Sequence, residues 1–484
     1  MRGTRQPSGS GPLLLAVTLM VLAASAESAA RDATEMPCVE QRWGCFSMGS
    51  YGRVQPAWNL RGGTGRPANL VSHGTRIELP PYAEVDLYFR KSIRRQGNGD
   101  GGEGEGGEQP TIRAGAVVTL GFLEDLFHFT GDFDQSFALR NLYGWADGLA
   151  GGRLMVWAGS RMYRGDDIYL FDYWPLDNLN TYGGGAELRL DLARIALHVG
   201  TNRLKDDFQF QEVDVQSDTP EPETVVFLDR QRTIVSLKAT VEGHPGGGEV
   251  GLKGKLYGEF HGLPSGLLMY EDGTRSEVLP SDFGWVVGGQ VGVWGFGHNG
   301  FANLFVRGAG GLGAYGEWAV PFGLDTEKKT TRAREFLTGV SANVESRHVG
   351  VMFGAYARYF RDADPNVYDL DDKWEFIVAA RPHVFVGRYF QPFVELSYQK
   401  QVPNGLSPET LTRDPAGIFK LAVGPSLAFK RGTYARPRFH AVYNLSVLDG
   451  NARRLYDDLD PRREQKVQHY LGIGVEWWIN SSSY

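Results

Sequence analysis

Short runs in which apolar and polar side chains alternate recur from Gly49 to the end of this chain of 484 residues. The clearest run is PYAEVDLYFR, Pro81–Arg90, in which Ala83, Val85, Leu87 and Phe89 share one face and Tyr82, Glu84, Asp86 and Tyr88 share the other. This alternation predicts β-strands, because successive side chains of a strand point to opposite faces. A strand with one apolar and one charged face suits a soluble sandwich or a transmembrane barrel, in which the apolar face meets lipid.

The same alternation predicts strands along most of the chain. The further strands are Arg113–Gly121, Leu154–Ser160, Ala186–Leu192, Ile195–Thr201, Val225–Val241, Phe283–Val293, Leu304–Gly313, Val349–Tyr359, Trp374–Val386, the run FVELSYQKQ from Phe393, Ile418–Lys430, Arg438–Val447 and Tyr470–Ile479. Sustained helical periodicity is absent. The chain beyond residue 26 has 484 − 26 = 458 residues. Shared among roughly 16–18 strands, this leaves about 25–29 residues per strand and connection, which suits tilted strands with some long loops.

The first 26 residues have the order of a secretory signal peptide. Arg2 and Arg5 precede the mostly apolar run Leu13–Ala24, and Ala24-Ser25-Ala26 is a small-x-small cleavage site, with a second candidate at Ser28-Ala29-Ala30. The apolar run is too short to span a bilayer, although an N-terminal anchor helix is an alternative. No later stretch approaches about 18 consecutive apolar residues, so the mature chain is expected to be either soluble or a transmembrane barrel.

Composition favours the barrel and excludes some partners. Glycine supplies 64 residues, which suits crowded pleated surfaces and turns, and aromatic residues make up 12%, which suits a membrane–water interface. The formal net charge of −7 argues against nucleic acid, which requires a basic surface, and is compatible with neutral or cationic solutes.

Two cysteines, Cys38 and Cys45, lie near the start of the mature chain. In an exported protein they predict a disulfide, with two free thiols as the alternative. Two thiols alone cannot complete a structural zinc site, and the ten histidines show no H-E-x-x-H spacing, so neither a metal nor a cofactor is expected. The predicted organisation is a signal peptide (1–26), an N-terminal segment with both cysteines (27–48) and a barrel (49–484).

An acidic, glycine-rich segment, NGDGGEGEGGE, spans Asn98–Glu108. Its composition predicts a flexible, solvated turn between two strands, because it offers no apolar side chain to bury. A cation-binding acidic loop is the alternative.

Several segments, taken in order, resemble the maltoporin-like family of sugar porins. They are GSYGR (Gly49–Arg53), YAEVDL (Tyr82–Leu87), SFALRNLYG (Ser136–Gly144), VWAGSRMYRGDDIYLFDYWPLD (Val156–Asp177), Arg381-Pro382, VELSY (Val394–Tyr398), ARPRFHAVY (Ala435–Tyr443) and VEWW (Val475–Trp478). The fourth is the strongest match, because it has the family pattern W-x-G-x-R-x-Y followed by a charged cluster and an acidic residue before aromatics. The resemblance covers nearly all of the mature chain, although patchily from 205 to 345.

The resemblance implies an all-β, transmembrane antiparallel barrel of about 18 strands in the bacterial outer membrane. It also implies a homotrimer, a third loop folded into the pore, here Arg161–Asp177, and facilitated diffusion of maltodextrin-like oligosaccharides along a file of aromatic rings. The second loop, about Leu123–Asp134, is shorter than the family's, in which it latches onto a neighbouring subunit.

Resemblance and strand parity together assign the sugar-binding residues. Tyr51, Tyr82, Trp174 and Trp478 are expected to supply rings, and Arg53, Glu84, Arg164, Asp167 and Asp172 to supply polar partners. Tyr51 shares a strand face with Arg53, Tyr82 shares one with Glu84, and Trp478 shares one with Glu476, so these faces should point to water. Two alternatives remain: Trp477 and Trp478 both belong to an interfacial girdle, or the charges only line the lumen and set ion selectivity.

Other functions compatible with the chain are a general or other-solute porin, a barrel enzyme and a soluble lectin-like sandwich. The enzyme requires a nucleophile with a positioned histidine, and GLPSG (Gly262–Gly266) is not G-x-S-x-G, so no enzymatic activity is expected. A continuous file of aromatic rings through the lumen would separate a sugar channel from a general porin.

Overall fold

The computed structural model describes residues 39–41, 44–93, 111–123, 126–132, 136–215, 223–270 and 275–481. The predicted signal peptide and the acidic segment Asn98–Glu108 lie outside the described residues. None of the helices in the described part has both the length and the apolar character needed to cross a membrane.

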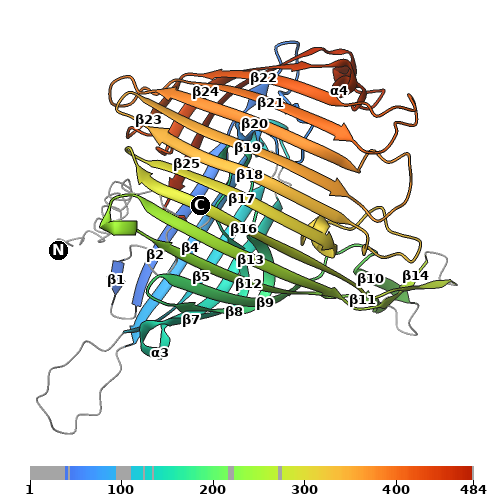
Figure 1. The fold of residues 1–484 in the computed structure, drawn as a ribbon, viewed down its shortest axis with the longest axis horizontal. Coiled ribbons are helices and arrows are strands. Elements are labelled where there is room, and N and C mark those ends of the chain that lie inside the picture. Colours follow the sequence, from blue (N-terminus) through green and yellow to red (C-terminus); the bar gives the residue numbers. More distant parts are fainter. Residues whose placement is uncertain are drawn as a thin grey trace, which may run out of the picture.

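Eighteen long strands of the described chain form one closed antiparallel barrel (Figure 1). They are β2 (Gly44–Val54), β4 (Tyr82–Ile93), β5 (Ile112–Leu123), β6 (Ser136–Gly148), β7 (Leu154–Arg164), β8 (Asn178–Arg189), β9 (Ala193–Asn202), β12 (Arg232–Gly243), β13 (Gly251–Leu263), β16 (Asp282–Phe296), β17 (Gly300–Gly311), β18 (Arg334–Glu345), β19 (Val349–Arg361), β20 (Lys373–Val384), β21 (Phe393–Pro403), β22 (Ala416–Gly424), β24 (Arg438–Leu448) and β25 (Val467–Ile479). The last strand pairs with the first through Tyr51 opposite Trp478 and Arg53 opposite Glu476, so the sheet has no free edge along this seam.

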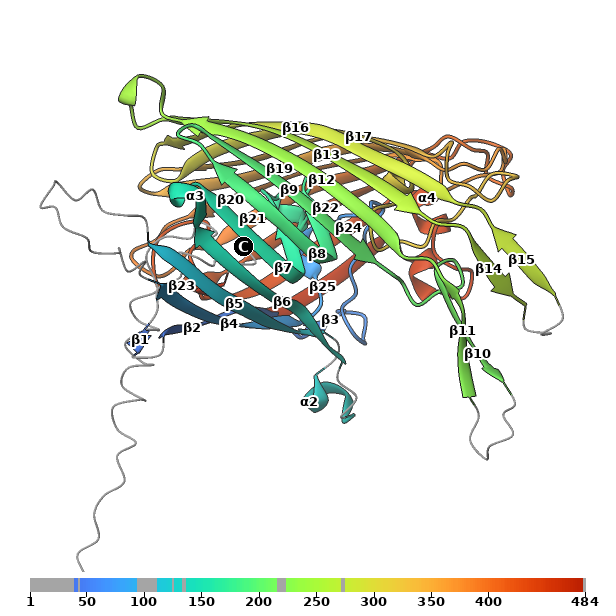
Figure 2. The ribbon, with the colours of Figure 1, turned by 90° about the horizontal axis from the view of Figure 1, so that it is seen from below.

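The remaining elements are short. They are the strands β1 (Val39–Gln41), β3 (Ala57–Trp58), β10 (Phe210–Val215), β11 (Glu223–Asp229), β14 (Gly266–Met269), β15 (Ser276–Leu279) and β23 (Ser426–Ala428), the helices α2 (Phe127–Thr130), α3 (Leu149–Gly152) and α4 (Gly450–Arg454), and the 3-10 turns η1 (Arg76–Glu78), η2 (Tyr169–Phe171), η3 (Pro245–Gly247), η4 (Leu312–Tyr315) and η5 (Pro461–Glu464). The hairpins β10–β11 and β14–β15 project beyond the barrel wall (Figure 2).

The two faces of the barrel wall differ in chemistry as the alternation predicts. On β4, Glu84 and Asp86 are fully buried on the inner side, whereas Phe89 is exposed on the outer side. On β16, Val287 and Val291 are exposed outward, and Gln290 between them is buried. An apolar outside around a polar inside is the arrangement of a barrel in lipid, and the predicted fold class is confirmed.

The connections differ between the two ends of the barrel. Turns such as 190–192, 297–299 and 346–348 join strands at one end, here the short-turn end. Longer loops such as 203–231 and 312–333 join them at the other, the long-loop end. Two of the long loops, L1 (residues 59–81) and L3 (residues 165–177), position the site described below.

The first barrel strand begins earlier than predicted. β2 starts at Gly44, not Gly49, and contains Cys45, so this cysteine does not precede the first strand. Cys45 is buried on the inner side and Phe46 is exposed on the outer side, so the alternation already begins there. The Cys38–Cys45 disulfide stays a prediction, because Cys38 lies outside the described residues.

The predicted strand Val225–Val241 is two strands. β11 ends at Asp229 and β12 begins at Arg232. Between them the Arg230 guanidinium donates hydrogen bonds to the carbonyl oxygens of Phe208, at 2.9 Å, and Pro264, at 2.8 Å, and so anchors the two projecting hairpins. No Gly or Pro marks this break, so alternation alone could not locate it.

Candidate functional site

L3 folds into the barrel, as predicted, but begins later. β7 continues to Arg164, so Arg161 belongs to the wall, and the inward segment is 165–177. Its apolar side chains join one buried cluster with residues of β13, β17, β18, β19 and β20. The cluster contains Val71, Ile168, Tyr169, Leu170, Phe171, Tyr173, Leu176, Tyr257, Phe305, Leu337, Met352, Tyr356, Ile377 and Ala379. L3 therefore crosses the lumen from β7 and β8 to the opposite wall.

Wall glycines make room for this packing. A Cβ on Gly354 of β19 would lie 2.8 Å from Cγ2 of Ile168, and one on Gly339 of β18 would lie 3.0 Å from Cδ1 of the same side chain. On β16, a Cβ on Gly288 would lie 2.6 Å from Cδ1 of Leu176. These positions receive L3 because they have no side chain of their own.

Carboxylates at both ends of L3 fix it to β12, β13 and β16. Asp166 accepts hydrogen bonds from Lys253, at 2.8 Å, and from Gln290, at 2.9 Å. Asp177 pairs with Lys238 at 3.1 Å and with Lys255 at 3.2 Å. Burial opposes ionisation of Asp166, but Lys255 and Lys253 outweigh it and hold the pKa of this carboxyl below its usual range.

L1 also folds inward, which the sequence did not indicate. The His73 ring stacks on Tyr173 of L3, with centroids 3.8 Å apart. Glu78 accepts a hydrogen bond from Asn444 at 2.6 Å and pairs with Lys420, and the Ser72 hydroxyl donates to Glu375 at 2.9 Å. L1 carries no recognisable motif, and its position depends on contacts that exist only in the closed barrel, such as the packing of Val71 in the buried cluster.

Arg76 joins the two inward loops to the barrel seam. Its guanidinium pairs with Asp172 of L3, pairs with Glu476 of β25 at 2.9 Å and donates to the Tyr51 hydroxyl of β2. Arg53 pairs with the same Asp172 at 3.1 Å and donates to the Tyr51 hydroxyl at 2.9 Å. Burial alone would raise the pKa of Asp172, but Arg76 and Arg53 lower it, so this carboxylate stays ionised.

Aromatic rings form a continuous file beside this junction. The centroid distances are 5.9 Å for Tyr82–Tyr51, 6.5 Å for Tyr51–Trp478, 6.2 Å for Trp478–Tyr434 and 6.0 Å for Tyr434–Phe301. Tyr169 of L3 packs on Trp478 at 5.7 Å and on Tyr434 at 5.2 Å. The file runs from the start of β4, at the long-loop end, to the start of β17, at the short-turn end.

The predicted rings Tyr51, Tyr82 and Trp478 thus lie together, with Arg53 and Asp172 beside them. Tyr51 is fully buried beneath the arginines, whereas Tyr82 and Trp478 are half-buried. Trp477 has the opposite parity, because it is next to Trp478 in the same strand, and its indole nitrogen donates to the Ser50 hydroxyl at 3.0 Å.

The other predicted polar residues have different surroundings. Glu84 is fully buried and pairs with Arg140. Arg164 lies over the Trp174 ring, 4.0 Å from its centroid, and donates to Asn178 at 2.8 Å. Asp167 is half-buried and makes no ion pair with a described residue. Burial, together with Asp172 and Asp166, raises its pKa to about 7 although Arg76 opposes the shift.

Arg436, Tyr169 and Tyr434 were not predicted for the site. Arg436 pairs with Glu476 at 2.7 Å and lies 4.9 Å from the centroid of Trp478. The segments that resemble the maltoporin-like family could have indicated them. Tyr169 lies in Val156–Asp177, Arg436 lies in Ala435–Tyr443, and Tyr434 directly precedes that segment. Alternation could not assign these side chains to the inner or outer face, because all three residues lie in loops between strands.

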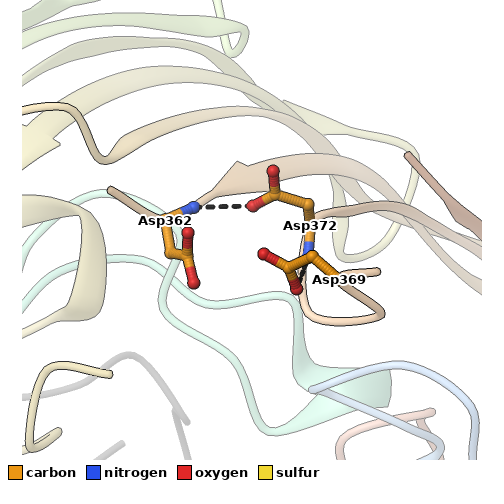
Figure 3. A group of neighbouring side chains, drawn as sticks. All are labelled: Asp362, Asp369 and Asp372. Carbon is orange, nitrogen blue, oxygen red and sulfur yellow. Dashed lines mark hydrogen bonds between the residues drawn. The ribbon is translucent and has the colours of Figure 1, made fainter. Parts of the chain in front are cut away.

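Three carboxylates meet in the loop between β19 and β20 (Figure 3). Oxygens of Asp362, Asp369 and Asp372 lie within 4.8 Å of one another, and the backbone N–H of Asp362 donates to Asp372 at 2.7 Å. Burial and then the neighbouring Asp369 raise the pKa of Asp362 to about 7. Hard cations such as Ca²⁺ prefer oxygen ligands of this kind. The hydrogen bonds shown here stay within the loop, and the structure assigns this cluster no part in the site.

Solved structures similar to this chain include Pseudomonas aeruginosa OprD, at 7% identity and a TM-score of 0.42, covering 94% of this chain and 99% of that one. Acinetobacter baumannii OccAB1 is 8% identical, with a TM-score of 0.42, and the match covers 93% of this chain and 99% of that one. Escherichia coli Wzi is described as a carbohydrate-binding β-barrel involved in capsule assembly. It is 11% identical, with a TM-score of 0.38, and the match covers 97% of this chain and 89% of that one. No curated protein matches this chain.

The family model described as LamB porin matches residues 112–478, which is most of the chain and extends from β5 nearly to the end of β25. The matched span includes L3 and the seam residues Glu476 and Trp478. With a closed barrel and an inward third loop, this chain belongs to the LamB porin family and is a porin of the bacterial outer membrane.

Proposed function

We propose that this porin lets sugars, including maltodextrin-like oligosaccharides, diffuse across the outer membrane along the file Tyr82–Tyr51–Trp478–Tyr434–Phe301. The continuity of this file carries the proposal. A sugar ring has a flat C–H face that packs on an aromatic ring and a rim of hydroxyls that donate and accept hydrogen bonds. Neighbouring rings allow one weak contact to replace the next, so a solute can enter and leave.

Polar side chains beside the file would bind the hydroxyl rim. Asp167 is the best placed acceptor, because it is half-buried and has no ion pair with a described residue. Arg53 and Asp172 form an ion pair beside Tyr51, so a sugar that binds there would replace part of this contact. Glu84, Arg164 and Trp174 are further binding residues, of which Glu84 would act through the Tyr82 hydroxyl that donates to it.

The working protein is proposed to be a homotrimer that reaches the outer membrane after removal of residues 1–26. The Cys38–Cys45 disulfide would then tie the segment before the barrel to β2. These features rest on the sequence and on the family to which the chain belongs.

The decisive experiment measures the current through purified trimers in planar bilayers while a panel of neutral oligosaccharides is added. Sugars should block the wild-type current in a saturable way. Trp478→Ala should weaken the block about two- to tenfold, the equivalent of about 0.5–1.5 kcal/mol for one aromatic contact. Trp477→Ala is the matched control, because that ring has the opposite parity, and it should leave the block unchanged.

Two outcomes contradict the proposal. If no sugar blocks the wild-type current, the chain is a general or other-solute porin. If only Trp477→Ala weakens the block, solute does not pass along the file.

A further inference from the structure

A cavity lies inside the barrel next to the aromatic file. It is lined by Tyr169, by Arg53 and Arg76, and by residues near the short-turn end, among them Arg381, Arg436 and Arg438. Glu476 is the one acidic residue among its lining residues in the described chain. The arginines come from β2, η1, β20, the turn 429–437 and β24, so residues far apart in sequence place cations around one space.

The ion pairs of the described residues reach four of the five arginines of this cavity. Arg53 and Arg76 share Asp172 and Glu476, and Arg436 pairs with the same Glu476. Arg381 pairs with Glu395 at 2.6 Å. Within the described part of the chain, four of the five arginines thus have a carboxylate partner in Asp172, Glu476 or Glu395.

Arg438 is the arginine without a carboxylate partner in the described chain. Its guanidinium donates to the carbonyl oxygens of Gly432, at 2.9 Å, and Thr433, at 2.7 Å, and lies 3.4 Å from the His383 ring nitrogens. The side chain is 3% exposed, and its Nε has no hydrogen-bond partner. A buried cation that lacks a counter-charge favours an anion in the adjoining space.

We propose that this cavity binds the anionic group of an acidic saccharide, either a sugar carboxylate or a sugar phosphate. Guanidinium groups match both anions, because their N–H donors form paired, charge-assisted hydrogen bonds with carboxylate or phosphate oxygens. The cavity is lined by Tyr169, which packs on Trp478 of the file, and Arg436 also lies against the Trp478 ring. A sugar ring packed on Trp478 therefore places a charged substituent near the arginines.

This inference rests on the proposed sugar channel and adds the class of sugar. The net charge of −7 belongs to the whole chain, whereas a solute in the cavity meets a lining of five arginines and one glutamate among the described residues. Charge of one sign in a narrow, low-dielectric passage concentrates solutes of the opposite sign. Acidic sugars should therefore bind more tightly than neutral sugars of the same size.

The first test uses wild-type trimers in bilayers with glucose, glucuronate, glucose 6-phosphate and inorganic phosphate as probes. Glucuronate or glucose 6-phosphate should half-block the current at about a tenfold lower concentration than glucose, and high salt should reduce the difference. The more strongly blocking probe identifies the anion as carboxylate or phosphate. Inorganic phosphate should compete with the acidic sugar and leave the glucose block unchanged.

The second test uses Arg438→Gln, which removes the unpaired charge and keeps hydrogen-bonding capacity. This variant should lose most of the preference for the acidic sugar and keep the glucose block, and Arg438→Lys should retain part of the preference. Arg358→Gln is the matched control: Arg358 is another inner arginine, pairs with Glu335 at 2.6 Å and does not line the cavity. The Arg358→Gln channel should prefer the acidic sugar over glucose as strongly as the wild-type channel does.

The outcomes separate the two proposals. A wild-type channel that no sugar blocks overturns the sugar function itself. A channel that glucose and the acidic sugars block equally, or in which Arg438→Gln and Arg358→Gln change the preference alike, keeps the sugar function and overturns the anionic site. If Arg438→Gln does not assemble, the wild-type series with phosphate competition decides alone.

Discussion

Arg76 of L1 forms an ion pair with Asp172 of L3, two residues separated by 96 positions in the sequence. The same guanidinium reaches Glu476 and the Tyr51 hydroxyl on the two strands of the seam. One side chain therefore fixes both inward loops against the place where the barrel closes.

Removing this side chain should widen the channel. Arg76→Ala leaves Glu476 and Asp172 each with one fewer partner, and breaking a buried pair costs about 3–5 kcal/mol. The loops should move outward and the single-channel conductance should rise. Arg61→Ala, at an exposed position of the same loop, is the control and should conduct like wild type. Equal conductance in all three proteins would show that Arg76 does not hold the loops in place.

Gly354→Ala should displace L3 without changing any charge. The added Cβ would lie 2.8 Å from Cγ2 of Ile168, a branch of a buried side chain that has little freedom to move. Overpacking of about 1–3 kcal/mol would shift the loop between seated and displaced positions by roughly 5- to 150-fold. The conductance should rise or fluctuate while ion selectivity stays constant. Gly254→Ala is the control, because nothing lies within 4 Å of its added Cβ.

Sugar affinity should depend on pH through Asp167. Its pKa is raised to about 7, mainly by burial, so the carboxyl is protonated below this pH and ionised above it. A carboxylate accepts stronger hydrogen bonds from hydroxyls than the neutral acid does, so affinity should increase from pH 6 to pH 8 by up to about tenfold. Asp167→Asn should abolish this dependence in bilayer block measurements. A dependence that persists in the Asn variant belongs to another group.

The loop between β19 and β20 should become more stable as the pH falls. The pKa of Asp362 is raised to about 7 by burial and by Asp369, above its value in an unfolded chain. Below pH 7 the folded loop therefore binds a proton that the unfolded loop binds only at lower pH. This proton stabilises the folded loop, and the stabilisation is lost as the pH rises through 7. Hydrogen exchange of residues 362–372 should slow between pH 8 and pH 5 after correction for intrinsic rates. Asp362→Asn should remove this change.

Most barrel strands could be predicted because alternation is a local property. The strand Gly251–Leu263 was missed since its sequence, GLKGKLYGEFHGL, has Gly at four positions, where no side chain reports a face. The strand Arg334–Glu345 was missed as well. For the site, parity placed Tyr51, Tyr82 and Trp478 on the inner side. It could not indicate L1 or Arg76, whose positions depend on contacts across the lumen between distant parts of the chain. Arg438 begins a predicted strand, but strand parity does not show which charges surround its side chain.

The seating of L3 also sets an order for assembly. Its apolar residues pack on strands from β13 to β20, which follow it in the sequence, and Asp172 and Tyr169 contact both strands of the seam. Contacts between residues so far apart form late, because they require the intervening chain to be in place. The lumen should therefore be wide while the barrel inserts, and the narrow passage should appear only after the first and last strands have joined. Selectivity would then be the final property that this protein acquires as it folds.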